Sequence, residues 1–229
     1  MQKPISIGAT LLALGLAAGC SNFHSLPGTE PSAVITGSGR FISETRPVTA
    51  FAAITVSGAI RVQIEHADAE SLTITAEDNI LPLVDSVIAG DRLTLGFKPG
   101  IGSMQNHGVD VHVGVRGVRG IDASGASRVD VSGLHGGDLR ITLSGASQFT
   151  GTGAVDRLDA DLSGASRMTA PALAARVASV TLSGASTALL RVLESLIGSA
   201  SGASLLEFLG DPFVEVQTSG ASLVRRAGP

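Results

Sequence analysis

Three aspartates have a type and spacing that could perform acid–base chemistry. Asp122 and Asp161 each stand two residues before a recurring Ser-Gly pair, and Asp159 shares a strand face with Asp161. In stacked strands Asp122 and Asp161 would lie roughly 10 Å apart, close to the 6.5 to 9.5 Å used by inverting glycosidases. A polysaccharide-cleaving site is therefore one hypothesis. We favour the alternative that these residues, with Asp130 and Asp138, are outward charges that keep the protein soluble, because no lysine or arginine column accompanies them.

Other reactive side chains give weaker patterns. His107, Asp110 and His112 are close in sequence, but they match no recognised spacing of metal ligands. The recurring serines lack a Gly-x-Ser-x-Gly motif, and no histidine recurs at a register near them. With 16 basic and 20 acidic residues, a net charge of −4, the chain shows no basic face for nucleic acid. We therefore predict no catalytic residue, no metal, no cofactor and no nucleic-acid partner.

The stretch that must position these residues is a repeat. The tetrapeptide Ser-Gly-Ala-Ser occurs six times, at steps of 20, 19, 20, 18 and 18 residues, with first serines at Ser124, Ser144, Ser163, Ser183, Ser201 and Ser219. A fixed short period indicates one structural unit that buries its apolar face against the next copy. Like residues of successive copies should then lie above one another.

The letters before each Ser-Gly pair alternate between apolar and polar, which is typical of a strand with one buried face. The glycine suggests a corner. A unit of 18 to 20 residues is too short for a crossover helix, so the sequence predicts an all-β, single-stranded parallel β-helix. A β-sandwich is the alternative. The segment 187–197 also fits helical spacing, but the repeat register favours a strand there.

Residues 1–19 have the features of an export signal: a positive start, a short apolar run and small residues at the cleavage point. The Leu-Ala-Ala-Gly sequence before Cys20 resembles a bacterial lipoprotein signal, which implies that Cys20 is lipidated. An ordinary cleavable signal with a chance cysteine is the alternative. Residues 20–39 are rich in Ser, Pro and Gly, which predicts a flexible tether between the anchor and the folded domain. By resemblance to enterobacterial sorting, Ser21 permits transfer to the outer membrane.

The domain after the tether resembles a known family. Strands are expected at 51–64, around an early Ser57-Gly58-Ala59 copy of the repeat, and at 72–76, 92–97 and 109–115. Together with the repeat, they are similar to the auto-transporter adhesin head GIN domain family in the motifs Arg46-Pro47-Val48, Phe51, Ile54 to Gly58, Glu77 to Pro82 and Asp91 to Leu95. The resemblance implies a right-handed β-helix over 40–226, leaving 227–229 as a tail. It brings no catalytic or binding residues.

These observations predict a non-enzymatic, lipid-anchored protein of the cell envelope, held at the outer membrane, with a glycan or protein as ligand. The rungs of uncharged Ser and Thr would offer hydrogen bonds to that ligand without a reaction centre. A polysaccharide lyase or hydrolase that uses Asp122, Asp159 and Asp161 is one alternative, and a structural spacer is another.

Overall fold

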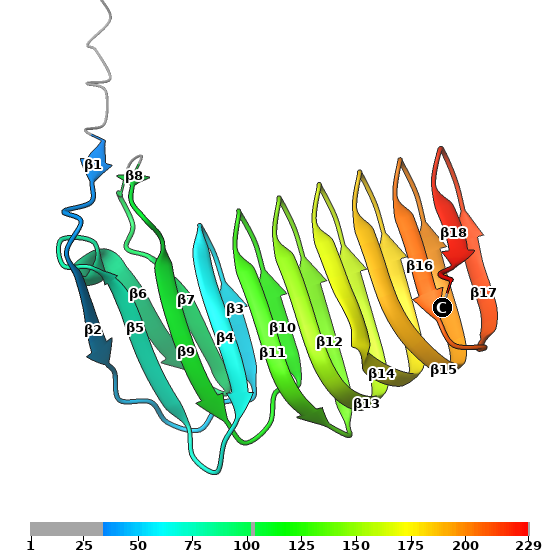
Figure 1. Ribbon diagram of the computed structural model, residues 1–229, viewed down its shortest axis with the longest axis horizontal. Coiled ribbons are helices and arrows are strands. Elements are labelled where there is room, and N and C mark those ends of the chain that lie inside the picture. The colour runs from blue at the N-terminus through cyan, green and yellow to red at the C-terminus, as the bar shows by residue number, and fades with distance from the viewer. Residues whose placement is uncertain (1–33, 102–103, 229) are drawn as a thin grey trace, which may run out of the picture. The chain divides into compact units, whose positions relative to one another are not determined.

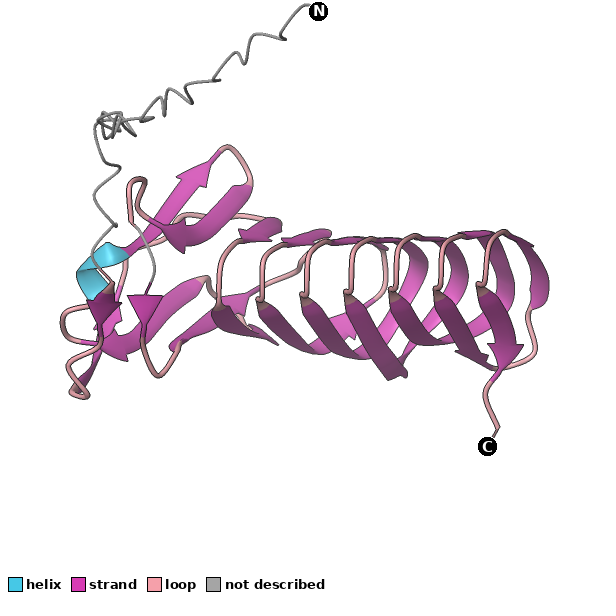
Figure 2. Cartoon of the chain, turned by 90° about the horizontal axis from the view of Figure 1, so that it is seen from above, coloured by secondary structure: helices cyan, strands magenta, loops and turns pink. Residues whose placement is uncertain are grey.

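The computed structural model describes residues 34–101 and 104–228, which fall within one compact unit, Ala33–Pro229. This unit is all-β, and its coils stack in a row as a β-solenoid (Figures 1 and 2). The one helical element in the described residues is a 3₁₀ turn, η1 (Leu81–Leu83). The predicted fold class is confirmed.

Each regular coil contributes a strand that runs into a Ser-Gly corner and a strand that leaves it. The strands running in form one face, the inbound sheet: β3 (Ala53–Val56), β10 (Gly120–Ala123), β12 (Asp138–Leu143), the second halves of β13 (Gln148–Leu162), β14 (Arg167–Leu182) and β15 (Thr187–Ala200), and β17 (Phe213–Thr218). The strands leaving form the outbound sheet: β4 (Ile60–His66), β11 (Arg128–His135), the first halves of β13, β14 and β15, β16 (Leu205–Leu209) and β18 (Leu223–Arg226). All these pairings are parallel.

The register of the stack matches the sequence alignment. Asp122 pairs with Thr142, and Thr142 pairs with Asp161. The corners also stack: the Ala146 amide donates to the Gly125 carbonyl oxygen at 2.7 Å, and the Ala126 amide donates to the Gly58 carbonyl oxygen at 2.9 Å. The early copy at Ser57-Gly58-Ala59 therefore belongs to the same column, as its sequence predicted.

Alternation of the side chains fills the space between the two sheets. The inward positions hold Ile, Val, Leu and Ala, with Phe149 the largest fully buried side chain. The ambiguous segment 187–197 lies in β15, where Leu190 is buried and Leu193 is 53% exposed. Strand periodicity therefore prevails over helical spacing, because only the strand places this segment in register with its neighbouring coils.

The first coils are not stacked in the order in which they occur in the chain. Strands β7 (Arg92–Phe97) and β9 (Val109–Val115) pair in parallel with β3 and β4 on their outer side. The chain then returns through residues 116–119, so that β10 and β11 pair with β3 and β4 on the opposite side. This crossover segment places sequence-distant residues side by side.

Antiparallel strands cover the outer coil. Strand β5 (Ser71–Glu77) pairs with β9, β6 (Val84–Ala89) pairs with β7, and β2 (Phe41–Thr45) pairs with β5. The change from parallel to antiparallel pairing ends the regular array and gives this end of the solenoid a cap, as expected for a terminal repeat. The strands expected at 72–76, 92–97 and 109–115 are all present.

A polar clamp holds the segment before the cap. Strand β1 (Ile35–Thr36) pairs with β8 (Met104–Gln105). The Asn79 side chain donates to the Thr36 carbonyl oxygen at 2.8 Å and accepts from the Ser38 amide at 3.0 Å. Within the described residues, contacts with the rest of the domain are therefore already present at Ile35 and Thr36.

Candidate ligand-binding site

The three aspartates considered for hydrolysis each lie beside an arginine on the outer face of the inbound sheet. The pairs are Asp122 with Arg92, Asp159 with Arg157 at 3.2 Å, and Asp161 with Arg140 at 3.0 Å. The sequence predicted no lysine or arginine column beside them, and the structure instead gives each aspartate a single arginine. The arginine comes from β7 for Asp122, from the neighbouring coil for Asp161 and from the same strand for Asp159. Each carboxylate is held by its own cation on an open sheet face, so the three do not converge on a substrate.

The other two acidic candidates lie elsewhere. Asp130, on the outer face of the outbound sheet, accepts a hydrogen bond from the Thr150 hydroxyl. Asp138 begins β12 at the edge of a cavity on the far side of the coil from the Ser-Gly corners. The five aspartates therefore form no common site.

The serine column is not a ligand surface. The last serine of five corners is buried: Ser127, Ser147, Ser166, Ser186 and Ser204. Five of the six first serines are half-buried, and four of these donate a hydroxyl hydrogen bond to a carbonyl oxygen of the coil before, as when Ser201 donates to Leu182 at 3.2 Å. The exposed tip of each corner is Gly and Ala. The expected hydrogen-bonding rungs are therefore wrong for these five last serines, since their side chains are buried inside the coil.

The histidine-containing segment does not gather into a metal site. The His107 Nδ1 atom lies 2.8 Å from Oε1 of the buried Glu77. Asp110 pairs with Arg61 at 3.0 Å, and His112 lies on the outer face of β9. Within residues 34–101 and 104–228, no group of three His, Cys, Asp or Glu side chains is placed to hold a metal ion. Glu77 instead holds nearby backbone, since it also accepts from the Gly39 amide at 2.8 Å and from the His107 amide at 3.3 Å.

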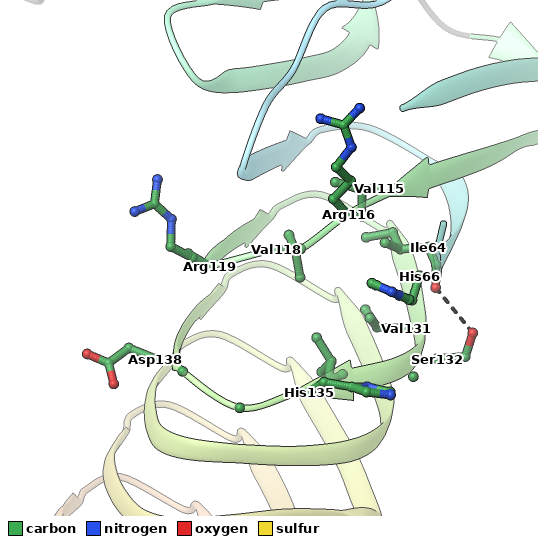
Figure 3. Close-up of a pocket in the computed structure, with 15 residues that line it drawn as sticks. Ile64, His66, Val115, Arg116, Val118, Arg119, Val131, Ser132, His135 and Asp138 are labelled. Atoms are coloured by element: carbon green, nitrogen blue, oxygen red, sulfur yellow. Dashed lines mark hydrogen bonds between the residues drawn. The ribbon is translucent and has the colours of Figure 1, made fainter. Parts of the chain in front are cut away.

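A cavity of about 400 Å³ lies between the crossover segment and the turn after β11 (Figure 3). Aliphatic side chains form its floor, and polar side chains stand around its mouth. The floor residues are Ile64, Val115, Val118, Val131 and Leu134, and the polar residues are His66, Arg116, Arg119, Ser132, His135 and Asp138. Its volume falls within the range of roughly 300 to 1,000 Å³ typical of small-ligand sites.

Local backbone geometry opens this cavity. The pairing of β11 with β13 shifts register between Val131 and Leu134, and Gly133, Gly136 and Gly137 all have positive φ. The turn therefore bends away from the crossover segment, as bulges and glycines allow. Because the crossover has no signal in local periodicity, the sequence did not reveal this site.

The mouth of the cavity is suited to binding. The His66 and His135 rings stack with centroids 5.4 Å apart and an interplanar angle of 16°. Arg116 donates to the Asp68 carbonyl oxygen at 2.8 Å, and Arg119 lies 3.5 Å from Asp91. Arg116, Arg119 and Asp138 point away from the cavity (Figure 3). His66 and His135 are therefore the polar side chains placed to hydrogen-bond a ligand above the apolar floor. The polar groups at the mouth do not form a nucleophile and base pair, since the Ser132 hydroxyl donates to the Ile64 carbonyl oxygen at 3.5 Å.

The expected lipidation site falls elsewhere in the chain. Cys20, the signal at 1–19 and residues 20–33 of the tether lie outside the described residues. Among the residues that the structure does describe, no helix has the length and apolar character needed to cross a bilayer.

The fold defines a β-solenoid domain capped at one end by antiparallel strands. The chain belongs to the family "Putative auto-transporter adhesin, head GIN domain", whose model matches residues 50–212. This confirms the family resemblance seen in the sequence. None of the curated proteins is similar enough to count as a match.

Solved structures support the same fold. A putative adhesin from Bacteroides fragilis has a TM-score of 0.70 at 16% identity, covering 84% of this chain and 100% of that protein. A putative lipid binding protein from Parabacteroides distasonis has a TM-score of 0.53 at 14% identity, covering 86% of this chain and 100% of that protein. At such low identity, the likeness concerns the fold alone.

Proposed function

We propose that this protein is a non-enzymatic, lipid-anchored protein of the cell envelope whose solenoid head binds a glycan or protein ligand. The observation that carries the proposal is the pairing of each candidate catalytic aspartate with an arginine on an open sheet face. Membership of an adhesin-like family supports a binding role.

The anchor in this proposal is a lipid on Cys20. A lone cysteine directly after an export signal suits lipidation, and it leaves no partner for an intramolecular disulfide. Residues 20–33 then connect the anchor to the segment clamped by Asn79. Ser21 favours delivery to the outer membrane over retention at the inner one.

Two measurements on the full chain test this proposal. Labelled palmitate should enter the wild type and the Ser21→Ala control, but not Cys20→Ala. Purified in detergent, the chain should bind bacterial cells or a member of a glycan array in a saturable way. If labelled palmitate does not enter the wild-type protein, the proposed lipid anchor is contradicted. If the wild type binds no cell, glycan or protein, a structural spacer is favoured.

An enzyme assay tests the main alternative. Incubation of the full chain with neutral and acidic polysaccharides should release no reducing ends and no unsaturated products. If products do form, and Asp122→Asn or Asp161→Asn abolishes them, the non-enzymatic proposal fails.

A further inference from the structure

The outer face of the outbound sheet carries a row of cationic and amide side chains directly after the corners. The row consists of Arg61, Arg128, Gln148 and Arg167, which are neighbours in register on β4, β11, β13 and β14. All four are exposed. Further along the stack the same position holds Thr187, Leu205 and Leu223, so the arginine row ends at Arg167.

The charges in the arginine row are poorly compensated. Arg61 pairs with Asp110 at 3.0 Å, whereas Arg128 donates to the neutral side chain of Gln148 at 2.7 Å. Among the described residues, neither Arg128 nor Arg167 has a carboxylate within 4.0 Å. Like charges on directly paired strand positions destabilise a sheet, and Arg61 and Arg128 are such a pair. An anion bound between them would relieve this repulsion.

A hollow of about 450 Å³ lies at the end of the arginine row formed by Arg61 and Arg128. Its polar side chains come from Arg61, Arg128, Gln148, Asn106, His107 and Ser127, and no acidic residue lines it. Gly108 keeps the loop backbone close to the guanidinium, since a Cβ there would stand 3.2 Å from Nη2 of Arg61. The hollow therefore combines two guanidinium groups with amide groups that can hydrogen-bond hydroxyls.

We propose that the arginine row binds an acidic glycan, a saccharide chain carrying carboxylate or sulfate groups. Guanidinium groups bind such planar or multi-oxygen anions through paired hydrogen bonds, and Gln148 and Asn106 suit the intervening hydroxyls. Arg128 and Arg167 stand two strand spacings apart, about 9.6 Å along the stack, which requires an extended ligand with repeated charges. This inference rests on the proposed binding function and specifies the class of its ligand.

In the described part of the chain, the inbound sheet, on the opposite face, has no comparable row of uncompensated arginines. There Arg92, Arg140 and Arg157 are each neutralised by an aspartate. Single-stranded nucleic acid also carries repeated charges, but its binding normally adds aromatic side chains on which bases stack, and no Phe, Tyr or Trp among the described residues lines the hollow. The arginine row is visible in the aligned sequence repeats. The residue directly after the last serine of the first three Ser-Gly-Ala-Ser copies is Arg128, Gln148 and Arg167.

The test measures binding of the full chain in detergent to polygalacturonate, dextran sulfate and neutral dextran at physiological salt. Wild type should bind one or both acidic polymers and not dextran, with affinity falling as salt rises. Arg128→Gln/Arg167→Gln should weaken binding at least about tenfold, from the loss of charged hydrogen bonds. Arg140→Gln/Arg157→Gln, which makes the same change in net charge on the opposite sheet, should leave affinity within about twofold. Arg128→Lys/Arg167→Lys should be intermediate, since lysine keeps the charge but loses the paired geometry.

The outcomes separate this inference from the proposed function. If the two double glutamine variants weaken binding equally, or if single-stranded DNA displaces the polymers at equal concentration, the arginine row is not an acidic-glycan site. Cell binding by the wild type that is unchanged in Arg128→Gln/Arg167→Gln also overturns the inference, while the binding function itself stands. Failure of the wild type to bind cells, glycans or proteins removes the proposed function as well.

Discussion

The amide nitrogen of Ala146 donates to the carbonyl oxygen of Gly125, one coil away, at 2.7 Å. The same bond recurs at each later corner, for example from Ala165 to Gly145 at 2.8 Å. A side chain on the glycine would push these backbones apart: a Cβ on Gly145 would stand 2.8 Å from the Gly125 carbonyl oxygen. The repeated glycine is therefore required by the close stacking of corners as well as by its positive φ.

This relationship predicts that Gly145→Ala is more destabilising than Gly137→Ala. Both glycines have similar positive φ, +70° and +73°, but a Cβ on Gly137 would meet no atom within 4 Å. We expect a loss of about 1 kcal/mol at Gly137 from backbone strain alone and about 2 to 4 kcal/mol at Gly145, where the backbone clash is added. Urea unfolding followed by circular dichroism measures both. Equal losses would mean that the corners are not packed as described.

The buried serines give a second matched pair. The Ser147 hydroxyl donates to the Ala123 carbonyl oxygen at 3.2 Å, whereas the buried Ser166 hydroxyl has no hydrogen-bond partner in the described structure. Ser147→Ala should therefore lower the free energy of unfolding by about 1 kcal/mol, and Ser166→Ala should leave it unchanged or raise it by about 1 kcal/mol. Unfolding curves for the two variants, collected side by side, check the difference. A larger loss at Ser166 would contradict it.

The ambiguous segment is tested by two leucines three residues apart. Leu190 is fully buried, and Leu193 is 53% exposed. Leu190→Ala should cost about 2 to 5 kcal/mol, as for other buried leucines, and Leu193→Ala should change stability by no more than about 0.5 kcal/mol. Thermal and chemical unfolding of both variants measure the difference. Similar costs at the two positions would argue for a helical face that buries both.

Glu77 gives a prediction about pH. Hydrogen bonds from His107 and from the Gly39 and His107 amides hold the pKa of this carboxyl below its ordinary value of 4.5, against the opposing effect of burial. A carboxyl whose pKa is lower in the folded state contributes stability above pH 4.5 that is lost as pH falls through the folded value. Stability should therefore drop in acid below about pH 4.5.

Glu77→Gln should be less stable than wild type near neutral pH, with a shallower decline of stability in acid. The measurement is the free energy of unfolding from pH 7 to pH 3. Glu215→Gln, an exposed carboxylate on β17, is the control and should follow the wild-type curve. If Glu77→Gln and wild type decline in parallel, Glu77 does not supply this part of the acid sensitivity.

Much of the fold could be predicted from local pattern. Alternation of apolar and polar letters identifies strands, because it reflects which neighbouring side chains along the chain are buried. A fixed period identifies stacked coils, because like residues one coil apart pack on one another. For this reason the Asp122, Thr142, Asp161 register and the early corner at Gly58 were predicted correctly.

The sites depended on contacts that local pattern does not record. The cavity beside His66 exists because the crossover carries β10 back across the first coil, and the pairing of Asp122 with Arg92 joins residues 30 positions apart through that same arrangement. The direction in which the serines turn was likewise decided by the packing of one coil on the next. The repeating coil and its corners can be read from the order of residues, since they follow from backbone and packing preferences of near neighbours. The stacking order of the first coils depends on long-range contacts, and it sets which charges are neutralised and which remain available to a ligand.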